Sequence, residues 1–328
     1  MPYNGTLLSE LRSIPDINIR LVNQPVEQER MLPLEIIRDC HILFTTFLPT
    51  NHLDMKELKF VQIGSAGYTQ LIGKGLPERG IIACNALGVF DVPIAEWNIA
   101  MMINMARDMK RLVHNQDNTI WDRSPRFQDE IRGKVVGIWG YGGIGRETAR
   151  LAKALGMRVR VLTRNGISDR INTYTVAGSG DPEARCPDQI FTANSVKKFL
   201  RGLDFLILAM PLTKETEGIV GEAELRLLEG AFILNPARGP IIQEEALLRA
   251  LSENWIAGAA LDTHYHYPMP EDHPLWKMPN VLMTPHISGS SANPKFLDRV
   301  WDIFVQNTAN FIEGKPLLNR LSDSQLLV

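Results

Sequence analysis

The feature that most constrains this chain is the glycine turn Gly140-Tyr-Gly-Gly-Ile-Gly145, which follows a short apolar run at residues 135–139. Behind the turn, Thr148, Leu151 and Leu155 recur at helical spacing, which predicts a helix starting at the third glycine. Such a strand, turn and helix N-terminus bind anions, because backbone N–H groups point outward and the helix dipole favours negative charge. We therefore predict that a dinucleotide lies against this turn rather than that the glycines serve packing alone. The residues expected to bind it are Gly140, Gly142, Gly143, Ile144 and Gly145.

Length, charge and cysteine content narrow the class of protein. A chain of 328 residues fits two domains, and a net charge of −2 argues against a nucleic-acid partner. No apolar run approaches the roughly 20 residues of a membrane span, and the N-terminus lacks a basic and apolar signal sequence. The three cysteines are far apart in the chain, as expected for reduced thiols. Together these features predict a cytoplasmic protein without a membrane partner.

Two α/β regions follow from the apolar pattern. A short helix at 6–12 precedes predicted strands that suit a small parallel sheet, and one long helix is expected at 92–114. The second region alternates strands with helices, contains a loop insertion at 172–188, and is followed by a final helix at 291–313. The predicted strands are 17–22, 42–46, 59–64 and 80–84 in the first region, and 135–139, 158–162, 205–209, 231–234, 258–261 and 281–284 in the second.

Seven separate segments, in this order and spacing, resemble the D-isomer-specific 2-hydroxyacid dehydrogenases over nearly the whole chain. The resemblance implies an α/β fold: a Rossmann-type doubly wound parallel sheet domain for the cofactor, inserted in a smaller flavodoxin-like substrate domain. The expected substrate-binding domain is 1–102 with 291–328, the expected dinucleotide-binding domain is 103–290, and cofactor domains of the family usually pair as a homodimer. The segments are Gly64-Ser-Ala-Gly-Tyr68, Ala95-Glu-Trp97, the glycine turn, Pro211-Leu-Thr-Lys-Glu-Thr216, Asn235-Pro-Ala-Arg-Gly239, Gly258-Ala-Ala-Leu-Asp262 and Thr284-Pro-His286.

The resemblance also implies roles for individual residues. Arg238 matches the family arginine, whose guanidinium can hold the substrate carboxylate and polarise the keto oxygen. His286 matches the acid/base, since imidazole can give or take a proton near neutral pH. The backbone amides of Ala66 and Gly67 match the loop that binds the substrate carboxylate. The matching cofactor contacts are Pro211, Thr216, the backbone of Ala237, and Asp262, of which the last two hold the nicotinamide carboxamide in relatives.

Two departures from the family pattern stand out. The strand that usually opens the substrate domain is not found, since the chain starts almost at a helix. Relatives carry a glutamate five residues after the aspartate that matches Asp262, and Tyr267 stands there in this chain. We expect Tyr267 to take the glutamate's place beside His286, where a neutral phenol stabilises imidazolium less than a carboxylate does.

The end of the second strand of the glycine-turn domain predicts which cofactor is preferred. NAD enzymes usually place an acid there to bond the ribose hydroxyls, and Thr163-Arg164-Asn165 contains none. Arg164 would instead meet a 2′-phosphate with a guanidinium. We therefore expect NADP(H) to be preferred and NAD(H) to be possible, with Thr163 and Asn165 beside the phosphate.

These residues predict an oxidoreductase that moves hydride between NADP(H) and C2 of a small 2-keto or 2-hydroxy acid of the glyoxylate, hydroxypyruvate or pyruvate class. One alternative is a cofactor-sensing binding protein, as in the related C-terminal-binding-protein corepressors, for which the missing glutamate would suit weak catalysis. Another alternative is an enzyme of the same fold that uses a different hydride donor, as in the related formate and phosphite dehydrogenases. No metal site is expected, since His264 and His266 lack further ligands at suggestive spacing, and Cys186 is expected to be a bystander.

Overall fold

The computed structural model describes residues 2–22, 28–125 and 129–327 and separates into two compact units. The first unit comprises Met1–Val89, Arg170–Val176 and Ser291–Val328, and the second comprises Phe90–Asp169 and Ala177–Ser290. The domain boundary expected at residues 102 and 103 falls inside helix α3 (Asp91–Ala106), which lies wholly in the second unit. Within the described residues, no helix combines the length and the apolar character that crossing a membrane requires.

The first unit is built on a three-stranded parallel sheet in the order β1-β2-β3, and helices α1 (Gly5–Ser13) and α9 (Pro294–Ile312) pack against each other in it. Phe60 of the central strand is buried among side chains of these helices, including Leu11 and Trp301. The strand predicted at 17–22 is wrong: its isoleucines pack against this core, but in the described part of the chain the segment pairs with no strand. The remaining elements of the unit are β1 (Ile42–Thr45), β2 (Phe60–Ile63), β3 (Ile82–Cys84), α2 (Leu34–Ile37), α10 (Asp323–Leu326) and 3-10 turns at His52–Asp54, Thr69–Leu71 and Pro77–Arg79.

A short segment, residues 170–176, overlaps the start of the insertion predicted at 172–188 and belongs to the first unit, although the chain on both sides of it belongs to the second. The Tyr174 hydroxyl donates to Asp302 Oδ2 over 2.9 Å, and the Tyr174 backbone N–H donates to Asn319 Oδ1 over 3.1 Å. Gly88 has a φ of +98°, and a Cβ on it would lie 2.4 Å from the Tyr174 carbonyl oxygen. Only glycine therefore fits against this segment.

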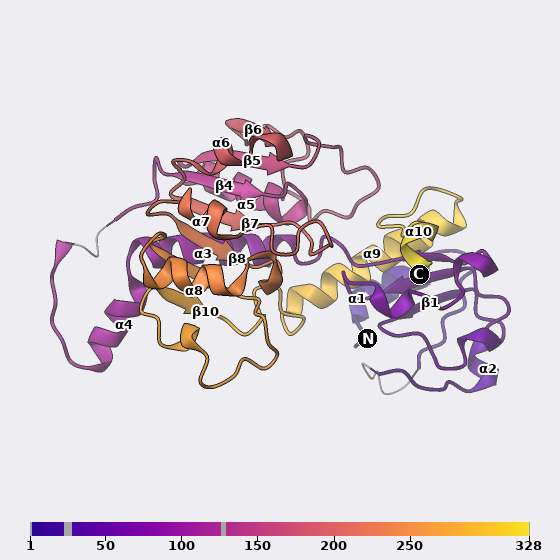
Figure 1. Ribbon diagram of the computed structural model, residues 1–328. Helices are drawn as coiled ribbons and strands as arrows, with labels where there is room; N and C mark the ends of the chain where they lie inside the picture. The colour runs from indigo at the N-terminus through magenta and orange to yellow at the C-terminus, as the bar shows by residue number, and fades with distance from the viewer. Residues whose placement is uncertain (1, 23–27, 126–128, 328) are drawn as a thin grey trace. The chain divides into compact units, whose positions relative to one another are not determined.

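The second unit contains a seven-stranded parallel sheet in the order β10-β9-β8-β7-β4-β5-β6 (Figure 1). All six predicted strands are present, and β6 was missed because its four residues are mostly exposed at the sheet edge and lack an apolar pattern. Buried apolar runs such as that of β4 are typical of parallel strands covered on both faces. The strands are β4 (Val135–Trp139), β5 (Arg158–Thr163), β6 (Gln189–Thr192), β7 (Phe205–Leu208), β8 (Phe232–Asn235), β9 (Gly258–Leu261) and β10 (Val281–Met283).

Helices cover both faces of this sheet (Figure 1). Side chains of α3 and α5 join one buried cluster, and side chains of α6, α7 and α8 join the cluster on the other face. The single helix predicted at 92–114 is wrong, because Asp108 has a φ of +46° and separates α3 from α4. The other elements are α4 (Met109–Asp117), α5 (Gly143–Ala154), α6 (Val196–Leu200), α7 (Glu222–Arg226), α8 (Glu244–Ser252) and 3-10 turns at Ala193–Ser195, Gly239–Ile241 and Pro274–Trp276.

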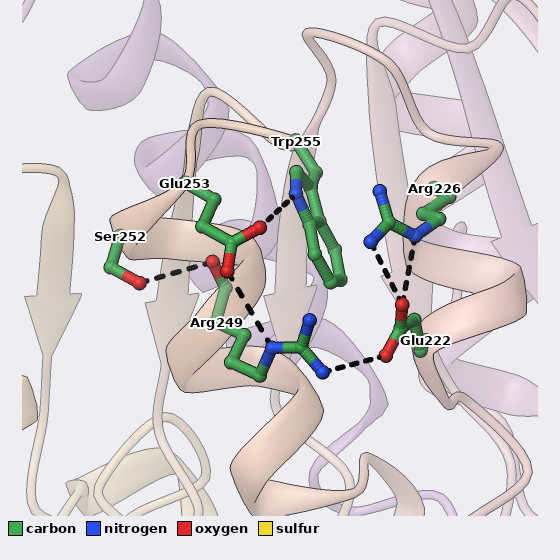
Figure 2. A network of polar contacts seen from close by, with 6 residues as sticks. All are labelled: Glu222, Arg226, Arg249, Ser252, Glu253 and Trp255. Atoms are coloured by element: carbon green, nitrogen blue, oxygen red, sulfur yellow. Dashed lines mark hydrogen bonds and ion pairs between the residues drawn. The ribbon is translucent and has the colours of Figure 1, made fainter.

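A surface network joins α7 to α8 (Figure 2). Glu222 accepts from both Arg226 and Arg249, at 2.8 and 2.9 Å, and the Arg226 guanidinium lies 3.7 Å from the centre of the Trp255 ring. The hydrogen bond from Arg226 holds the pKa of Glu222 below its usual value. These groups are about half exposed, so the network orients the two helices more than it stabilises the fold.

The core of the second unit predicts a large cost for losing a buried ring. Phe205 is fully buried and stacks on Phe232, with ring centres 5.5 Å apart. Phe205→Ala should lower the free energy of unfolding by about 3–5 kcal/mol, measured by urea denaturation, because it leaves a cavity between the sheet and the layer of α3 and α5. The matched Ile190→Ala change on the exposed edge strand should cost no more than about 0.5 kcal/mol. Equal costs would contradict this account of the core.

Candidate active site

The glycine turn joins β4 to α5, and the helix begins at Gly143, two residues earlier than predicted. Gly140 has a φ of +104°, and a Cβ on it would lie 2.6 Å from the Ala209 carbonyl oxygen. A Cβ on Gly145 would lie 2.3 Å from the Gly140 carbonyl oxygen, whereas a Cβ on Gly142 would meet no atom within 4 Å. Two glycines are thus required by close backbone packing, and the third leaves the open approach that a pyrophosphate needs. The turn therefore fits a dinucleotide.

The parallel sheet brings the other candidates of the second unit to the same edge as this turn. Parallel strands have their carboxyl ends on one side, and each candidate follows a strand. The chain runs outward from β4 through β5 to β6 and then returns to β7, so the turn lies where the strand order reverses, the usual place for a ligand. The residues that follow strands are the glycine turn after β4, Thr163-Arg164-Asn165 at the end of β5, Pro211 and Thr216 after β7, Ala237 and Arg238 after β8, Asp262 after β9 and His286 after β10.

The stretch that would choose the cofactor ends β5. Thr163 Oγ1 accepts from the Gly166 N–H over 2.9 Å, while the side chains of Arg164 and Asn165 are exposed. Hydrogen bonding by Thr213 and, to a lesser degree, the positive charge of Arg164 hold the pKa of Glu215 below its usual value. Arg164 therefore lies within electrostatic reach of the loop after β7.

That loop, residues 211–216, is closed by one hydroxyl. Thr216 Oγ1 donates to the Pro211 carbonyl oxygen over 2.7 Å and accepts from the Thr213 N–H, also over 2.7 Å. The loop is thereby held as a compact turn beside the glycine turn, since Gly140 packs against Ala209 just before it. Pro211 and Thr216 are both predicted cofactor contacts.

A buried asparagine shapes the loop that carries Arg238. Asn235 Oδ1 accepts from the N–H groups of Ala237 and Arg238, at 3.1 and 3.2 Å, and its Nδ2 donates to the Arg238 carbonyl oxygen over 2.8 Å. The Arg238 side chain is exposed, and its Nη1 donates to the Ala237 carbonyl oxygen over 2.6 Å. The guanidinium is thus accessible to an anion.

Asp262 is fully buried and organises the loop after β10. Its Oδ1 accepts from Thr284 Oγ1 over 2.5 Å and from the Ile287 N–H over 2.9 Å. Its Oδ2 accepts from the Ser288 N–H over 3.0 Å and from the Ser288 hydroxyl, and its carbonyl oxygen accepts from the His286 N–H over 2.8 Å. The carboxylate is therefore engaged in holding the histidine loop, a role that the sequence did not indicate.

His286 has left-handed backbone geometry, with a φ of +57°, which the bonds to Asp262 support. Partial burial of the ring, followed by the positive charge of Arg238, lowers the pKa of His286 below its ordinary value, while the charge of Asp262 acts in the opposite direction. Because its charge affects the pKa of His286, Arg238 lies within electrostatic reach of the imidazole. The structure thus brings the predicted anion-binding and proton-transfer groups of the second unit together.

Tyr267 lies beside His286, with ring centres 5.6 Å apart and the planes inclined by 55°. Its hydroxyl accepts from the His264 N–H over 3.1 Å. Across residues 2–22, 28–125 and 129–327, no hydrogen bond links that hydroxyl to the His286 imidazole. The phenol therefore packs against the histidine through its ring and not through its hydroxyl.

The two histidines of the H-x-H segment point to different surroundings. His264 is buried, and its Nε2 is 2.8 Å from the Thr284 carbonyl oxygen, whereas His266 is about half exposed. Among the residues that the structure describes, no group of three histidine, cysteine or acidic side chains could hold a metal ion.

Burial and then the charge of Asp181 raise the pKa of Cys186 to about 11, which makes it a poor nucleophile.

The first unit holds the candidate carboxylate loop after β2. The Asn85 side-chain amide donates to the Ala66 carbonyl oxygen over 2.7 Å, and Ser65 Oγ donates to the Gly67 carbonyl oxygen over the same distance. These bonds hold the carbonyl groups, and a Cβ on Gly67 would meet no atom within 4 Å. In the described part of the chain, the N–H groups of Ala66 and Gly67 have no acceptor. The loop can therefore offer them to an anion.

Comparison with known proteins agrees with this arrangement. Residues 99–288 match the family model described as D-isomer specific 2-hydroxyacid dehydrogenase, NAD binding domain, which covers more than half of the chain. The chain belongs to this family. It is an NAD(P)-dependent 2-hydroxyacid dehydrogenase, and the predicted α/β class and Rossmann-type fold are confirmed.

Individual relatives span nearly the full chain. A glyoxylate reductase of Thermococcus kodakarensis is 30% identical over 327 residues, covering 93% of this chain and 92% of the relative. A D-isomer specific 2-hydroxyacid dehydrogenase family protein of Aeromonas salmonicida superposes with a TM-score of 0.71 at 27% identity, covering 88% and 87% of the two chains. An NADPH-dependent glyoxylate/hydroxypyruvate reductase of Sinorhizobium meliloti, solved with NADP and sulfate, has a TM-score of 0.70 at 25% identity, covering 90% and 89%.

Proposed function

We propose that this dehydrogenase reduces the C2 carbonyl of a small 2-keto acid of the glyoxylate, hydroxypyruvate or pyruvate class. The observation that carries the proposal is that an exposed Arg238 guanidinium lies within electrostatic reach of the His286 imidazole, at the edge of the sheet that also bears the glycine turn. The second unit would serve as the dinucleotide-binding domain and the first as the substrate-binding domain. The Thermococcus and Sinorhizobium relatives, both named as glyoxylate reductases, support the same substrate class.

The chain's own residues would divide the work between binding and proton transfer. In the first unit, the N–H groups of Ala66 and Gly67 would donate to a carboxylate. In the second unit, Arg238 would hold the substrate carboxylate and polarise the keto oxygen. His286 would donate its proton to the oxygen as negative charge develops there. A bound nicotinamide, with Ala237 and Asp262 beside it, supplies the hydride chemistry. Of these two, Ala237 would contribute a backbone group, while Asp262 would act by holding the histidine loop.

A panel of 2-keto acids assayed with NADPH and with NADH tests the proposal. We expect turnover of at least one small 2-keto acid and a loss of about 10²- to 10⁴-fold in kcat for His286→Ala, because a positioned proton donor contributes that much. Absence of turnover across the panel, or turnover unchanged in the variant, would favour the cofactor-sensing protein instead. Direct titration of NADPH would then still report whether the glycine turn binds its ligand.

The cofactor preference is a separate proposal: NADP(H) is preferred, and Thr163, Arg164 and Asn165 surround the 2′-phosphate. The absence of an acid at the end of β5 and the exposure of Arg164 support it, as does the bound NADP of the Sinorhizobium relative. Arg164→Ala should raise the KM for NADPH by about 10- to 100-fold and leave the KM for NADH nearly unchanged, because one charge-assisted contact to phosphate is lost. Arg158→Ala, at the opposite end of the same strand, is the matched control. Equal effects on both cofactors would contradict the assignment.

The tyrosine beside the acid/base predicts a shifted pH profile. Reduction requires protonated His286. Because the pKa of His286 is lowered, the rate of reduction should start to fall, as the pH rises, at a lower pH than it would with a histidine of ordinary pKa. In Tyr267→Glu, a carboxylate should stabilise imidazolium and move the alkaline limb of kcat/KM to higher pH. Tyr267→Phe should leave the limb in place, because the lost hydroxyl bonds the His264 amide and not the imidazole. A glutamate variant that is active with an unshifted limb would show that residue 267 is not the histidine's partner.

A homodimer is the proposed assembly. Five large apolar side chains on α3, on α4 and just beyond α4 are more than a third exposed, and Trp121 is 90% exposed. Exposed apolar side chains of this size suit an interface with a second copy of this chain. Light scattering should give about twice the 36.9 kDa chain mass at micromolar protein, and Trp121→Glu should shift it toward the monomer. A native mass near 36.9 kDa would refute the dimer. The five residues are Ile103, Met109, Val113, Ile120 and Trp121.

A further inference from the structure

Among the first four residues of the glycine turn, only one has a side chain. Gly140, Gly142 and Gly143 have none, so Tyr141 alone can anchor the first four residues of the turn. Glycine leaves the backbone free to adopt many conformations. A pyrophosphate site needs its N–H groups fixed to within about 0.5 Å. The contacts that hold the Tyr141 side chain therefore influence how well the turn binds a dinucleotide.

Tyr141 is held by a residue far along the chain. Its buried hydroxyl donates to Asp181 Oδ2 over 2.5 Å. Burial, and then the hydrogen bond to Asp181, raise the pKa of Tyr141, so its hydroxyl keeps the proton that it donates. Asp181 is itself buried, and its carboxylate also accepts from the N–H groups of Arg185 and Cys186, each over 2.9 Å. These bonds fix the carboxylate toward the turn from the loop between β5 and β6.

The first turn of α5 grips the same loop. Arg146, next to the last glycine, is almost fully buried, and its guanidinium donates to the Asp181 carbonyl oxygen and, over 2.7 Å, to the Ser168 carbonyl oxygen. The guanidinium also lies 5.2 Å from the centre of the Tyr141 ring, within range of a cation–π contact. Asp181 is thus tied by its main chain to the helix and by its side chain to the turn. A loop held at both points can fix the turn's geometry.

We propose that Asp181 is a positioning residue for the dinucleotide site: its carboxylate holds Tyr141 and thereby sets the conformation of the pyrophosphate-binding turn. Open space over Gly142 and the buried anchor of Tyr141 together leave one approach to the turn free while its other residues stay fixed. The pyrophosphate is common to NADPH and NADH, so the anchor acts on both cofactors equally. The inference rests on the proposed dinucleotide site and is independent of which cofactor is preferred.

Direct titration of each cofactor by calorimetry tests this role without relying on turnover. Tyr141→Phe and Asp181→Asn should each raise the dissociation constants of NADPH and of NADH by a similar factor, about 10-fold, because the turn loses its anchor. The double variant should bind about as weakly as Tyr141→Phe alone, because both changes act on the same hydrogen bond: the first removes its donor, and the second replaces a charged acceptor with a weaker amide oxygen. Tyr174→Phe is the matched control, since it removes another tyrosine-to-carboxylate hydrogen bond from the same insertion but within the first unit. It should lower the melting temperature and leave both dissociation constants unchanged.

The outcomes separate positioning from simple stabilisation. Unchanged dissociation constants in Tyr141→Phe, with a fall in melting temperature like that of Tyr174→Phe, would overturn the proposal. So would a rise for NADPH alone, which would place the effect at the 2′-phosphate. If Asp181→Asn does not fold, the conservative Tyr141→Phe change decides the matter. Failure of the reductase assay would leave these titrations interpretable, because they measure binding alone.

Discussion

Parallel pairing of the seven strands in the second unit is the constraint on which its candidate site depends. Because every strand runs the same way, the segments that follow β4, β5, β7, β8, β9 and β10 emerge along one edge. Residues more than 140 positions apart in the chain, such as Gly140 and His286, thereby share one side of the sheet. The buried apolar faces on both sides of the sheet hold that arrangement rigid enough for chemistry.

Buried polar side chains then shape the loops that the strands deliver. Asn235 holds the arginine loop, Asp262 holds the histidine loop, and Asp181 reaches the glycine turn through Tyr141. Each of the three is nearly or fully buried and has its acceptors occupied by N–H or hydroxyl groups of a local loop. Leaving such a group unpaired would cost about 1–3 kcal/mol, so each loop has one strongly favoured conformation. The exposed Arg238 is placed by this scaffold, while its guanidinium stays available.

Tyr267 is an uncharged neighbour of His286, the proposed acid/base. Its ring packs beside His286, yet its hydroxyl is turned to the His264 amide, so the imidazole gains contact area without gaining a charged partner. Arg238 and partial burial then act on His286 together, and both disfavour the imidazolium. The negative charge of Asp262 acts in the opposite direction.

The sequence by itself determined the strand–turn–helix unit at residues 135–154, the positions of the six main strands along the chain and the family to which the chain belongs. Those features are encoded locally, as apolar runs, glycine spacing and short motifs. Tertiary structure decided the rest. The edge strand β6 forms by pairing with β5 although its own residues are exposed, and 17–22 stays unpaired although its pattern alternates. The partner of Tyr141 was equally out of reach, because Asp181 lies 40 residues further along the chain and only folding brings its loop against the turn.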